Sequence, residues 1–330
     1  MVYSTTQSTE EEVSQCARCE GRPFYTRIYS GEVLCESCFR DSIVEKTRRT
    51  MAKYRMVARG GRIGVAVSGG KDSLSLLHVL HNLRESHGCE LVAISVDEGV
   101  EGYRDEALSH AKDATARLGV EHVLVSYREL FGFSLDQALH WNERRDVSSC
   151  SFCGVFRRRA IDEGAARAKV SVVATAHNLD DFVQTFMMNL LHGDVSRLGW
   201  LDPAYKGGGF PMRRVKPFLE IYEEELALFA YSSGIPFQSV SCPYMHEGLR
   251  SEVRDYLNQM EASHPGMKNV LFGSALEVIS RLGRSEGKLA VPCGSCGRPS
   301  SSGLCNVCRM KEEVRRHLNY DAPTPPPGGG

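Results

Sequence analysis

The sequence of 330 residues has no apolar run long enough to cross a bilayer, and no segment with the composition of a secretory signal peptide. It also lacks an excess of one charge, since 40 lysines and arginines stand against 41 aspartates and glutamates. These absences argue against a membrane protein, a secreted protein, and nucleic-acid binding through overall charge, although local basic patches remain compatible with such binding. We therefore expect a soluble, cytoplasmic protein with one large domain and small appendages.

Disulfides are not expected either, although the chain has 12 cysteines, because cytoplasmic thiols stay reduced. Eight of the cysteines form C-x2-C pairs, and the pairs combine into two quartets with the spacing of zinc ligands. Each quartet lies in a short segment with too few apolar residues for a core, so metal binding would supply folding free energy, on the order of 10 kcal/mol for a zinc-finger site. We predict two closed, structural zinc sites, formed by Cys16, Cys19, Cys35 and Cys38 and by Cys293, Cys296, Cys305 and Cys308.

Two common nucleotide-binding fingerprints are missing as well. The Walker pattern fails because Asp72 follows Lys71, and G-x-G-x-x-G does not occur in this region. The apolar run 63–67 is followed instead by S-G-G-K-D-S, which resembles the loop of ATP enzymes that release pyrophosphate. A strand, a glycine turn and a helix aim free N–H groups at an anion, and two glycines let the backbone approach phosphate oxygens. We predict that the loop binds a nucleotide's phosphates through Ser68, Gly69, Gly70, Lys71, Asp72 and Ser73.

Strand and helix patterns alternate after residue 60, which is typical of an α/β fold with a doubly wound parallel sheet and ligands at the carboxyl ends of its strands. We expect strands at 63–67, 91–96, 122–126 and 171–176, with a short strand-like segment at 235–240. We expect helices at 73–86, 103–118, 129–142, 153–169, 180–191, 219–232, 248–261 and 269–282. The chain then divides into a zinc module (1–40), a basic helical connector (41–60), a catalytic domain (61–285), a second zinc module (286–318) and a disordered tail rich in proline and glycine (319–330).

Polar side chains follow two other expected strands. Asp97 ends the second strand, and His177 opens the segment H-N-L-D-D after the fourth. Asp180 fits the N-cap of the helix that begins there, and we expect His177 to be a hydrogen-bonded turn residue. Asp181 lies one residue inside the helix, where it is free to coordinate Mg²⁺ or to orient a nucleotide.

Four cysteines remain outside the quartets. Cys89 is expected to be an ordinary buried residue. Cys150 and Cys153 begin a helix that continues into three arginines, and a helix N-terminus beside arginines lowers the pKa of a thiol. Cys242 follows the strand-like segment at 235–240. These three cysteines are candidates for reactive thiolates or for metal ligands.

Together, the S-G-G-K-D-S loop, the C-S-F-C-G motif at Cys150, the H-N-L-D-D segment, Cys242 and both quartets resemble one family. These are the tRNA 2-thiouridine synthetases of archaea, some thermophilic bacteria and the eukaryotic cytosol, within the PP-loop ATP pyrophosphatase superfamily. The resemblance spans residues 16–308. The segment 150–158 is most similar to the wobble-uridine branch, whereas the T-loop branch often carries lysine at the position of Arg157.

This resemblance implies a PP-loop fold of the adenine nucleotide α-hydrolase type, with ATP and Mg²⁺ bound at the strand ends. The adenosine would be flanked by Ala66, Val67, Ser68 and Val96, the phosphates held by residues 69–73, and the site completed by Arg157, Ala176 and Asp181. Asp72 is also implied in catalysis, and Arg157 in neutralising phosphate charge. Cys150, Cys153 and Cys242 match the family cysteines that hold a [4Fe–4S] cluster, whose fourth iron is free to bind sulfide.

The activity implied is that of an ATP-dependent tRNA sulfurtransferase, which adenylates O2 of a uridine and replaces that oxygen with sulfur. The expected position is wobble uridine 34, and T-loop uridine 54 is the alternative. A persulfide relay through Cys150 and Cys242 is the alternative to the cluster, and a PP-loop ligase for a small molecule is the alternative enzyme class. The implied partners are tRNA, a ubiquitin-like protein thiocarboxylate or free sulfide as sulfur donor, and a second copy or a companion subunit. The expected RNA contacts are the basic segments 157–159, 167–169 and 213–216, with the zinc modules as outer contacts, whereas 315–316 is expected to be a solvated helix face.

Overall fold

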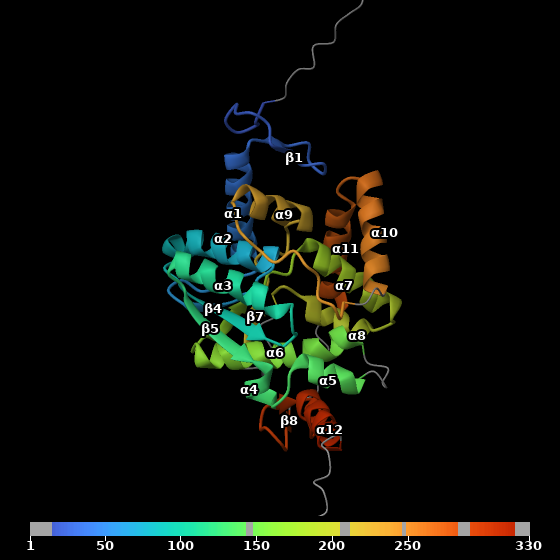
Figure 1. The fold of residues 1–330 in the computed structure, drawn as a ribbon. Helices are drawn as coiled ribbons and strands as arrows, with labels where there is room; N and C mark the ends of the chain where they lie inside the picture. The colour runs from blue at the N-terminus through green and yellow to red at the C-terminus, as the bar shows by residue number, and fades with distance from the viewer. Residues whose placement is uncertain (1–14, 143–147, 205–211, 246–248, 283–290, 321–330) are drawn as a thin grey trace, which may run out of the picture.

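The computed structural model describes residues 15–142, 148–204, 212–245, 249–282 and 291–320. Its centre is a parallel sheet of five strands in the order β5-β4-β3-β6-β7 (Figure 1). The strands are β3 (Arg62–Ala66), β4 (Glu90–Asp97), β5 (Glu121–Ser126), β6 (Val172–Ala174) and β7 (Arg213–Val215). The four strands expected from the sequence are confirmed. The fifth, β7, was expected only as a basic segment, because an edge strand can carry charged residues where a central strand cannot.

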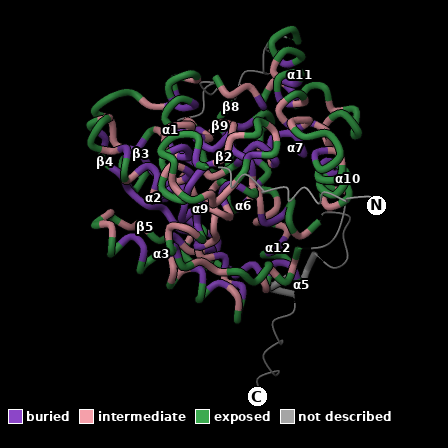
Figure 2. The backbone as a smooth tube through the Cα atoms, turned by 90° about the horizontal axis from the view of Figure 1, so that it is seen from above, coloured by how far each residue is buried: buried purple, intermediate pink, exposed green. Residues whose placement is uncertain are grey.

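Helices cover both faces of the sheet, so the doubly wound α/β architecture is confirmed. On one face, α2 (Lys71–His87) packs against α1 (Glu36–Lys53) and α9 (Glu223–Ser232), and α3 (Arg104–Leu118) lies beside α2. On the other face, α6 (Ser149–Arg167) packs directly on β4 and β5. Gly164 permits this contact, because a Cβ there would lie 2.5 Å from the Ile94 side chain. Buried backbone is concentrated in the strands and the inner faces of these helices (Figure 2).

The remaining helices extend the molecule beyond the sheet edge. They are α4 (Tyr127–Phe131), α5 (Leu135–Asn142), α7 (Leu179–Leu191), α8 (Val195–Leu198), the 3-10 turn η1 (Gly199–Leu201), α10 (Leu249–Ser263), α11 (Met267–Leu282) and α12 (Asn306–Tyr320). The single helix expected at 129–142 is wrong, because the chain turns at Gly132, with φ of 87°, and starts again at Leu135. The segment 235–240 forms no strand, although it is well placed against the phosphate loop. Among the described helices, none combines the length and apolarity of a membrane span.

A small hairpin and a helix form each terminal module, and the two modules lie at opposite ends of the molecule (Figure 1). The N-terminal hairpin pairs β1 (Tyr25–Thr26) with β2 (Val33–Leu34), and α1 follows it without a break. The C-terminal hairpin pairs β8 (Val291–Pro292) with β9 (Pro299–Ser300), and α12 follows. The expected tail lies outside the described residues from 321 onward, and so does the expected boundary at 285.

Candidate active site at the switch point of the sheet

The carboxyl ends of β3 and β6 mark the point where the sheet changes direction. From β3 the chain builds outward through β4 to β5, and it then returns to place β6 on the other side of β3. In doubly wound sheets, ligands bind in the crevice at this switch point. The S-G-G-K-D-S loop follows β3, and the H-N-L-D-D segment follows β6. Both expected nucleotide segments therefore border the same crevice.

The loop after β3 presents an uncapped helix end. α2 begins at Lys71, its N-cap residue is Gly70, and no described side chain caps it. The N–H groups of its first turn are therefore open to a ligand. The Ser73 hydroxyl holds the loop in shape, because it accepts a hydrogen bond from the Ser68 N–H at 3.0 Å and donates to the Gly70 carbonyl at 3.0 Å.

The two loop glycines differ in what a Cβ atom at each position would contact. Gly69 has φ of 88°, and a Cβ there would lie 2.1 Å from the carbonyl oxygen of Ala107 in α3. A glycine is required at this position because of the positive φ and the close approach of α3. At Gly70 the nearest atom to a Cβ would be the Ser68 hydroxyl at 3.6 Å. The space in front of the helix end is therefore open.

Charged side chains surround this opening. The Lys71 ammonium contacts Asp72 at 3.0 Å and Glu223 of α9 at 2.9 Å. Burial raises the pKa of Asp72 to about 6, against the opposing effect of Lys71, and the charge of Asp181 contributes to the increase. A second cation, such as a metal ion bound with a triphosphate, would stabilise the ionised form of this buried carboxylate.

The expected N-cap at Asp180 is wrong. Asn178 caps α7, and Asp181 completes a capping box: the Asp181 N–H donates to the Asn178 side chain at 3.0 Å, and the Asn178 N–H donates to Asp181 at 3.2 Å. Asp180 is buried and paired with Lys268 of α11 at 2.5 Å, a partner too distant in sequence to be foreseen. Asp181 keeps 38% of its side chain exposed toward the crevice region that Asp72 shares. His177 accepts or donates a hydrogen bond to Thr175 at 2.9 Å, as expected for a turn residue.

Three thiols meet beside this crevice from two distant segments. Cys150 and Cys153 lie in the first two turns of α6, which Ser148 caps through the Ser151 N–H at 3.3 Å. Cys242 lies in the loop after α9, and the Cys150 sulfur is 3.8 Å from the Tyr244 carbonyl of that loop. The charge on Cys150 raises the pKa of Cys242, and the charge on Cys242 raises the pKa of Cys153, so the three thiols lie in one neighbourhood.

The expected lowering of the thiol pKa is wrong for Cys153. Burial raises the pKa of Cys153, although Arg157 opposes this effect and donates a hydrogen bond to its sulfur at 3.3 Å. Burial also raises the pKa of Cys242, although the Tyr244 N–H and Arg157 oppose it. The positive charge of Arg157 is partly cancelled by Glu98, whose carboxylate it contacts at 2.7 Å. Desolvation therefore outweighs the helix end and the arginine.

Sequence reasoning missed the buried ion pairs that connect the two halves of the site. Glu98, 4% exposed, forms an ion pair with Arg104 at 2.8 Å and accepts a hydrogen bond from Arg157 at 2.7 Å. Arg104 is 6% exposed and also donates to the Ser68 carbonyl of the phosphate loop at 2.6 Å. A continuous chain of contacts therefore runs from the loop through Arg104, Glu98 and Arg157 to Cys153. The signal in the sequence was an acidic residue just beyond Asp97 at a strand end, while Asp97 itself accepts from the Gly99 N–H at 2.8 Å and stabilises the turn.

A second connection comes from the segment before Cys242. The Gln238 N–H donates to the Gly69 carbonyl at 3.1 Å, and its side-chain amide donates to the Tyr103 carbonyl at 2.5 Å. The segment expected to be a strand is therefore bonded to the phosphate loop and to the start of α3. Four residues further on it delivers Cys242. The loop and the thiols are thus positioned by common contacts.

Three basic side chains near the loop and the thiols are partly enclosed by protein. Surrounding protein desolvates Arg157, yet 52% of its side chain is accessible to solvent. The same holds for His177, whose pKa is lowered by desolvation although the residue is exposed. Desolvation also lowers the pKa of Lys216 at the end of β7. Groups that are surrounded by protein and still touch water lie in a depression of the surface, where a ligand can reach them.

Both cysteine quartets have the geometry of single-ion sites. In each, the four sulfurs lie within 4.8 Å of one another. Four thiolates at about 2.3 Å from one Zn²⁺ have such spacing. Without a cation the four charges oppose one another: a hydrogen bond from Ser37 lowers the pKa of Cys35 to about 6, whereas interaction with Cys19 raises the pKa of Cys38 to about 12. The quartets therefore fit a structural metal ion. Cys89, which belongs to neither quartet, is buried as expected.

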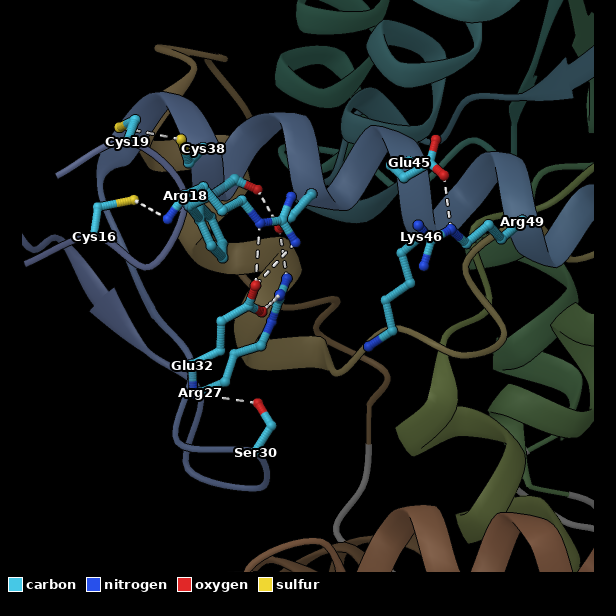
Figure 3. A network of polar contacts seen from close by, with 12 residues as sticks. Cys16, Arg18, Cys19, Arg27, Ser30, Glu32, Cys38, Glu45, Lys46 and Arg49 are labelled. Atoms are coloured by element: carbon cyan, nitrogen blue, oxygen red, sulfur yellow. Dashed lines mark hydrogen bonds and ion pairs between the residues drawn. The ribbon is translucent and has the colours of Figure 1, made fainter. Parts of the chain in front are cut away.

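Ion pairs connect the N-terminal module to α9, and Figure 3 shows their members Arg18, Arg27 and Glu32 within the module. Arg27 contacts Glu32 within the module and Glu225 of α9 at 2.7 Å, and Arg18 also contacts Glu32, at 3.0 Å. Glu225 is fully buried and receives a second cation, Lys46 of α1, at 3.3 Å. At the other end, Arg159 of α6 donates to two quartet sulfurs, Cys296 and Cys305, at 3.5 Å each.

Comparison with known proteins agrees with this arrangement. The family model of the PP-loop domain matches residues 42–261. The chain is 35% identical over 308 residues to cytoplasmic tRNA 2-thiolation protein 1 of Chlamydomonas reinhardtii, covering 92% of this chain and 85% of that protein. It is 34% identical over 311 residues to the protein of that name from Xenopus laevis, covering 92% and 89%. The chain belongs to the tRNA 2-thiolation proteins of the PP-loop family.

A solved structure is similar over nearly the whole chain. This is the U34-tRNA thiolase NcsA of Methanococcus maripaludis, described with its [4Fe–4S] cluster. The TM-score is 0.78 at 32% identity, and the match covers 91% of this chain and 96% of the archaeal one. The fold of the tRNA 2-thiolation proteins therefore extends through both terminal modules of this chain. The family resemblance noted from the sequence is confirmed.

Proposed function

We propose that this protein is an ATP-dependent tRNA sulfurtransferase that converts uridine 34 to 2-thiouridine. One observation carries the proposal: the phosphate loop and the three thiols are held on one cleft by the contacts of Gln238, Glu98 and Arg104. A reaction that activates an oxygen with ATP and then replaces it with sulfur needs both groups at one substrate atom. The names of the relatives support tRNA as substrate and the cytoplasm as location, and the name of NcsA supports position 34.

The nucleotide half uses the open end of α2. The N–H groups of residues 71–73 and the Lys71 ammonium would bind the β- and γ-phosphates, and Ala66, Val67, Val96 and Ala176 would flank the adenosine. Asp72 and Asp181 would hold Mg²⁺, because the Asp181 carboxylate lies near enough to raise the pKa of Asp72. Uracil O2 would attack the α-phosphorus of ATP, the bond to the bridging oxygen would break, and pyrophosphate would leave.

The sulfur half uses the thiols of Cys150, Cys153 and Cys242. The residues fit a [4Fe–4S] cluster, because two segments bring three thiols into one neighbourhood beside the positive charge of Arg157. Such a cluster, when bound, would present sulfide on an iron that no cysteine occupies. Arg157 would orient Cys153 and would favour negative charge in the cleft. Hydrosulfide sulfur then forms the bond to uracil C2, the C2–O bond breaks, and AMP leaves with that oxygen.

Two finer alternatives use the same residues. In one, Cys150 carries a persulfide and Cys242 resolves it; in the other, the substrate is uridine 54 of the T-loop. The third thiol, Cys153, favours the cluster, since a persulfide relay needs two cysteines. The sulfur donor would be a thiocarboxylate protein or free sulfide, and a second copy or companion subunit is the proposed assembly.

Anaerobic purification followed by nucleoside mass spectrometry tests the proposal. The protein should contain iron and sulfide, retain about two zinc ions per chain in its quartets, and form 2-thiouridine in tRNA with ATP, Mg²⁺ and sulfide. Transcripts with cytidine at position 34 or at position 54 identify the modified site. ATP–pyrophosphate exchange stimulated by a small metabolite and not by tRNA would contradict the proposal.

A further inference from the structure

A pocket of about 490 Å³ lies next to the cleft but not at the phosphate loop. It is formed by α6, β7, the turn η1 and the start of α12 in the C-terminal module. Its size suits one nucleotide, because small-molecule pockets generally measure about 300–1,000 Å³. Nothing in the proposed chemistry of ATP or of the three thiols uses it.

The wall of the pocket is strongly cationic. Five basic side chains line it against two aspartates. Arg214 is paired with Asp162, but the Arg158 guanidinium and the Lys216 ammonium have no hydrogen-bond partner among the described residues. Desolvation and the neighbouring Arg214 lower the pKa of Arg158, so the positive charges repel each other at this place. The pocket is therefore complementary to an anion, and a phosphate would relieve the repulsion.

An exposed indole borders the same wall. Trp200 in η1 is 65% exposed, an unusual state for the largest apolar side chain. Leu201, Pro203 and Met212 continue the apolar side of the pocket. An aromatic face next to unpaired arginine is the arrangement that binds single-stranded nucleic acid, because the ring stacks on a base and the cation holds the phosphate.

Two cations of the pocket wall lie near the residues of the crevice. Lys216 lines the pocket and also interacts with Asp181 and His177 of the crevice, and Arg158 interacts with His177 as well. Arg158 is also adjacent in sequence to Arg157, which contacts Cys153. A nucleotide in this pocket would thus lie beside the one in the cleft.

From this geometry we infer that the pocket is a subsite for an unpaired nucleotide of the tRNA loop adjacent to the modified uridine. Trp200 stacks on the base, and Arg158 with Lys216 binds its phosphate. The inference rests on the proposed function, since it assigns a place to the same RNA. It gives the enzyme a means to hold a splayed-out loop while the target base enters the cleft.

The test uses the full-length protein and an unmodified anticodon stem-loop RNA, without ATP or sulfide. The sequence contains two tryptophans, so a fluorescence change on RNA binding that disappears in Trp200→Phe belongs to Trp200. Trp200→Ala should weaken binding roughly ten-fold or more, and Trp200→Phe should retain most of the affinity because a phenyl ring still stacks. Arg158→Ala should weaken binding and reduce its salt dependence by about one phosphate contact.

Tyr231→Ala is the matched control, because Tyr231 is 79% exposed but lies on α9, which packs against α2. Unchanged affinity in Trp200→Ala, or a fluorescence signal that RNA does not alter, would overturn the inference. Shielding of Trp200 that depends on protein concentration without RNA would overturn it in favour of a protein interface. Because this assay involves no chemistry, wild-type protein that binds RNA through Trp200 but forms no 2-thiouridine would refute the proposed function and leave the subsite standing.

Discussion

Replacement of Glu98 should separate the structural and the functional roles of the buried ion pairs. Glu98 is 4% exposed and holds two arginines, of which Arg104 is 7% exposed in its side chain and Arg157 is 52% exposed. Loss of the carboxylate in Glu98→Ala leaves the Arg104 charge buried, which typically costs about 3–5 kcal/mol. The lower end applies here, because Arg104 still donates to the Val96 and Ser68 carbonyls. We expect a decrease of unfolding temperature on the order of 10 °C.

Glu98→Gln is the informative variant for function. It retains one acceptor oxygen and nearly the same volume, so the fold should persist, but the charge that orients Arg157 is lost. The contact of Arg157 with Cys153 should then loosen, and iron retention and thiolation should decrease roughly 10–100-fold, the usual effect of losing a residue that orients a ligand. Binding of Mg-ATP should change little, because the loop keeps its own hydrogen bonds.

The assay compares iron content after anaerobic purification, ATP affinity and 2-thiouridine formation for each variant. Glu101→Gln is the matched control, because Glu101 is exposed and its side chain makes no contact with either arginine among the described residues. Arg157→Ala should produce the same loss as Glu98→Gln, and the double variant should lose no more. If Glu98→Gln kept full iron content and full activity, the chain of contacts would have no part in positioning the thiols.

Three further outcomes follow from the site. In protein free of metal and nucleotide, the pKa of Asp72 is raised from 3.8 to about 6. The folded state therefore binds this proton more tightly than the unfolded state, and the free energy of unfolding decreases as pH rises from about 4 to about 6. Asp72→Asn should flatten this pH dependence in thermal unfolding and abolish thiolation, and an unchanged pH profile would contradict the assignment. Glu225→Ala should destabilise the N-terminal module by about 3–5 kcal/mol because Arg27 loses its buried partner, seen as earlier zinc release on heating. Replacement of Cys150, Cys153 or Cys242 by serine should remove iron and leave zinc in place. Loss of zinc with retention of iron would contradict the assignment of these three cysteines to the cluster.

The parts of the site that could be predicted from the sequence are those whose geometry is determined by residues close together in the chain. The S-G-G-K-D-S loop and the two quartets belong to this group, since a strand-to-helix turn and a C-x2-C pair fix their own geometry. The cap of α7 shows the limit: Asn178 and Asp180 are both good N-cap residues, and burial of Asp180 against Lys268 decided between them. Likewise, β7 could not be separated from a basic loop until Val215 was seen beside β6.

The connections across the site could not be predicted, because each depends on segments that only the fold brings together. The sequence around Glu98 does not indicate that Arg104 and Arg157 contact it from two helices on opposite faces of the sheet. The same is true of Gln238, whose hydrogen bond to Gly69 explains why the segment before Cys242 is extended without being a strand. The raised pKa values of Cys153 and Cys242 could not be predicted from the sequence either. They result from burial, which depends on the tertiary fold, whereas the helix end can be recognised in the local sequence.

The spacing of the thiols separates the three sulfur sites by kind. Among the described residues, two groups bring three or more potential ligands within 4.8 Å of one another, and these are the two quartets. Cys150, Cys153 and Cys242 do not form such a group, so their sulfurs are not all within 4.8 Å of one another. A cluster of several irons bridges a wider set of thiols, and with three of them it leaves one iron for a ligand that is not protein. In the proposed function, this difference in spacing corresponds to closed metal sites in the two quartets and to an open cluster site at the three thiols, where sulfur would be exchanged.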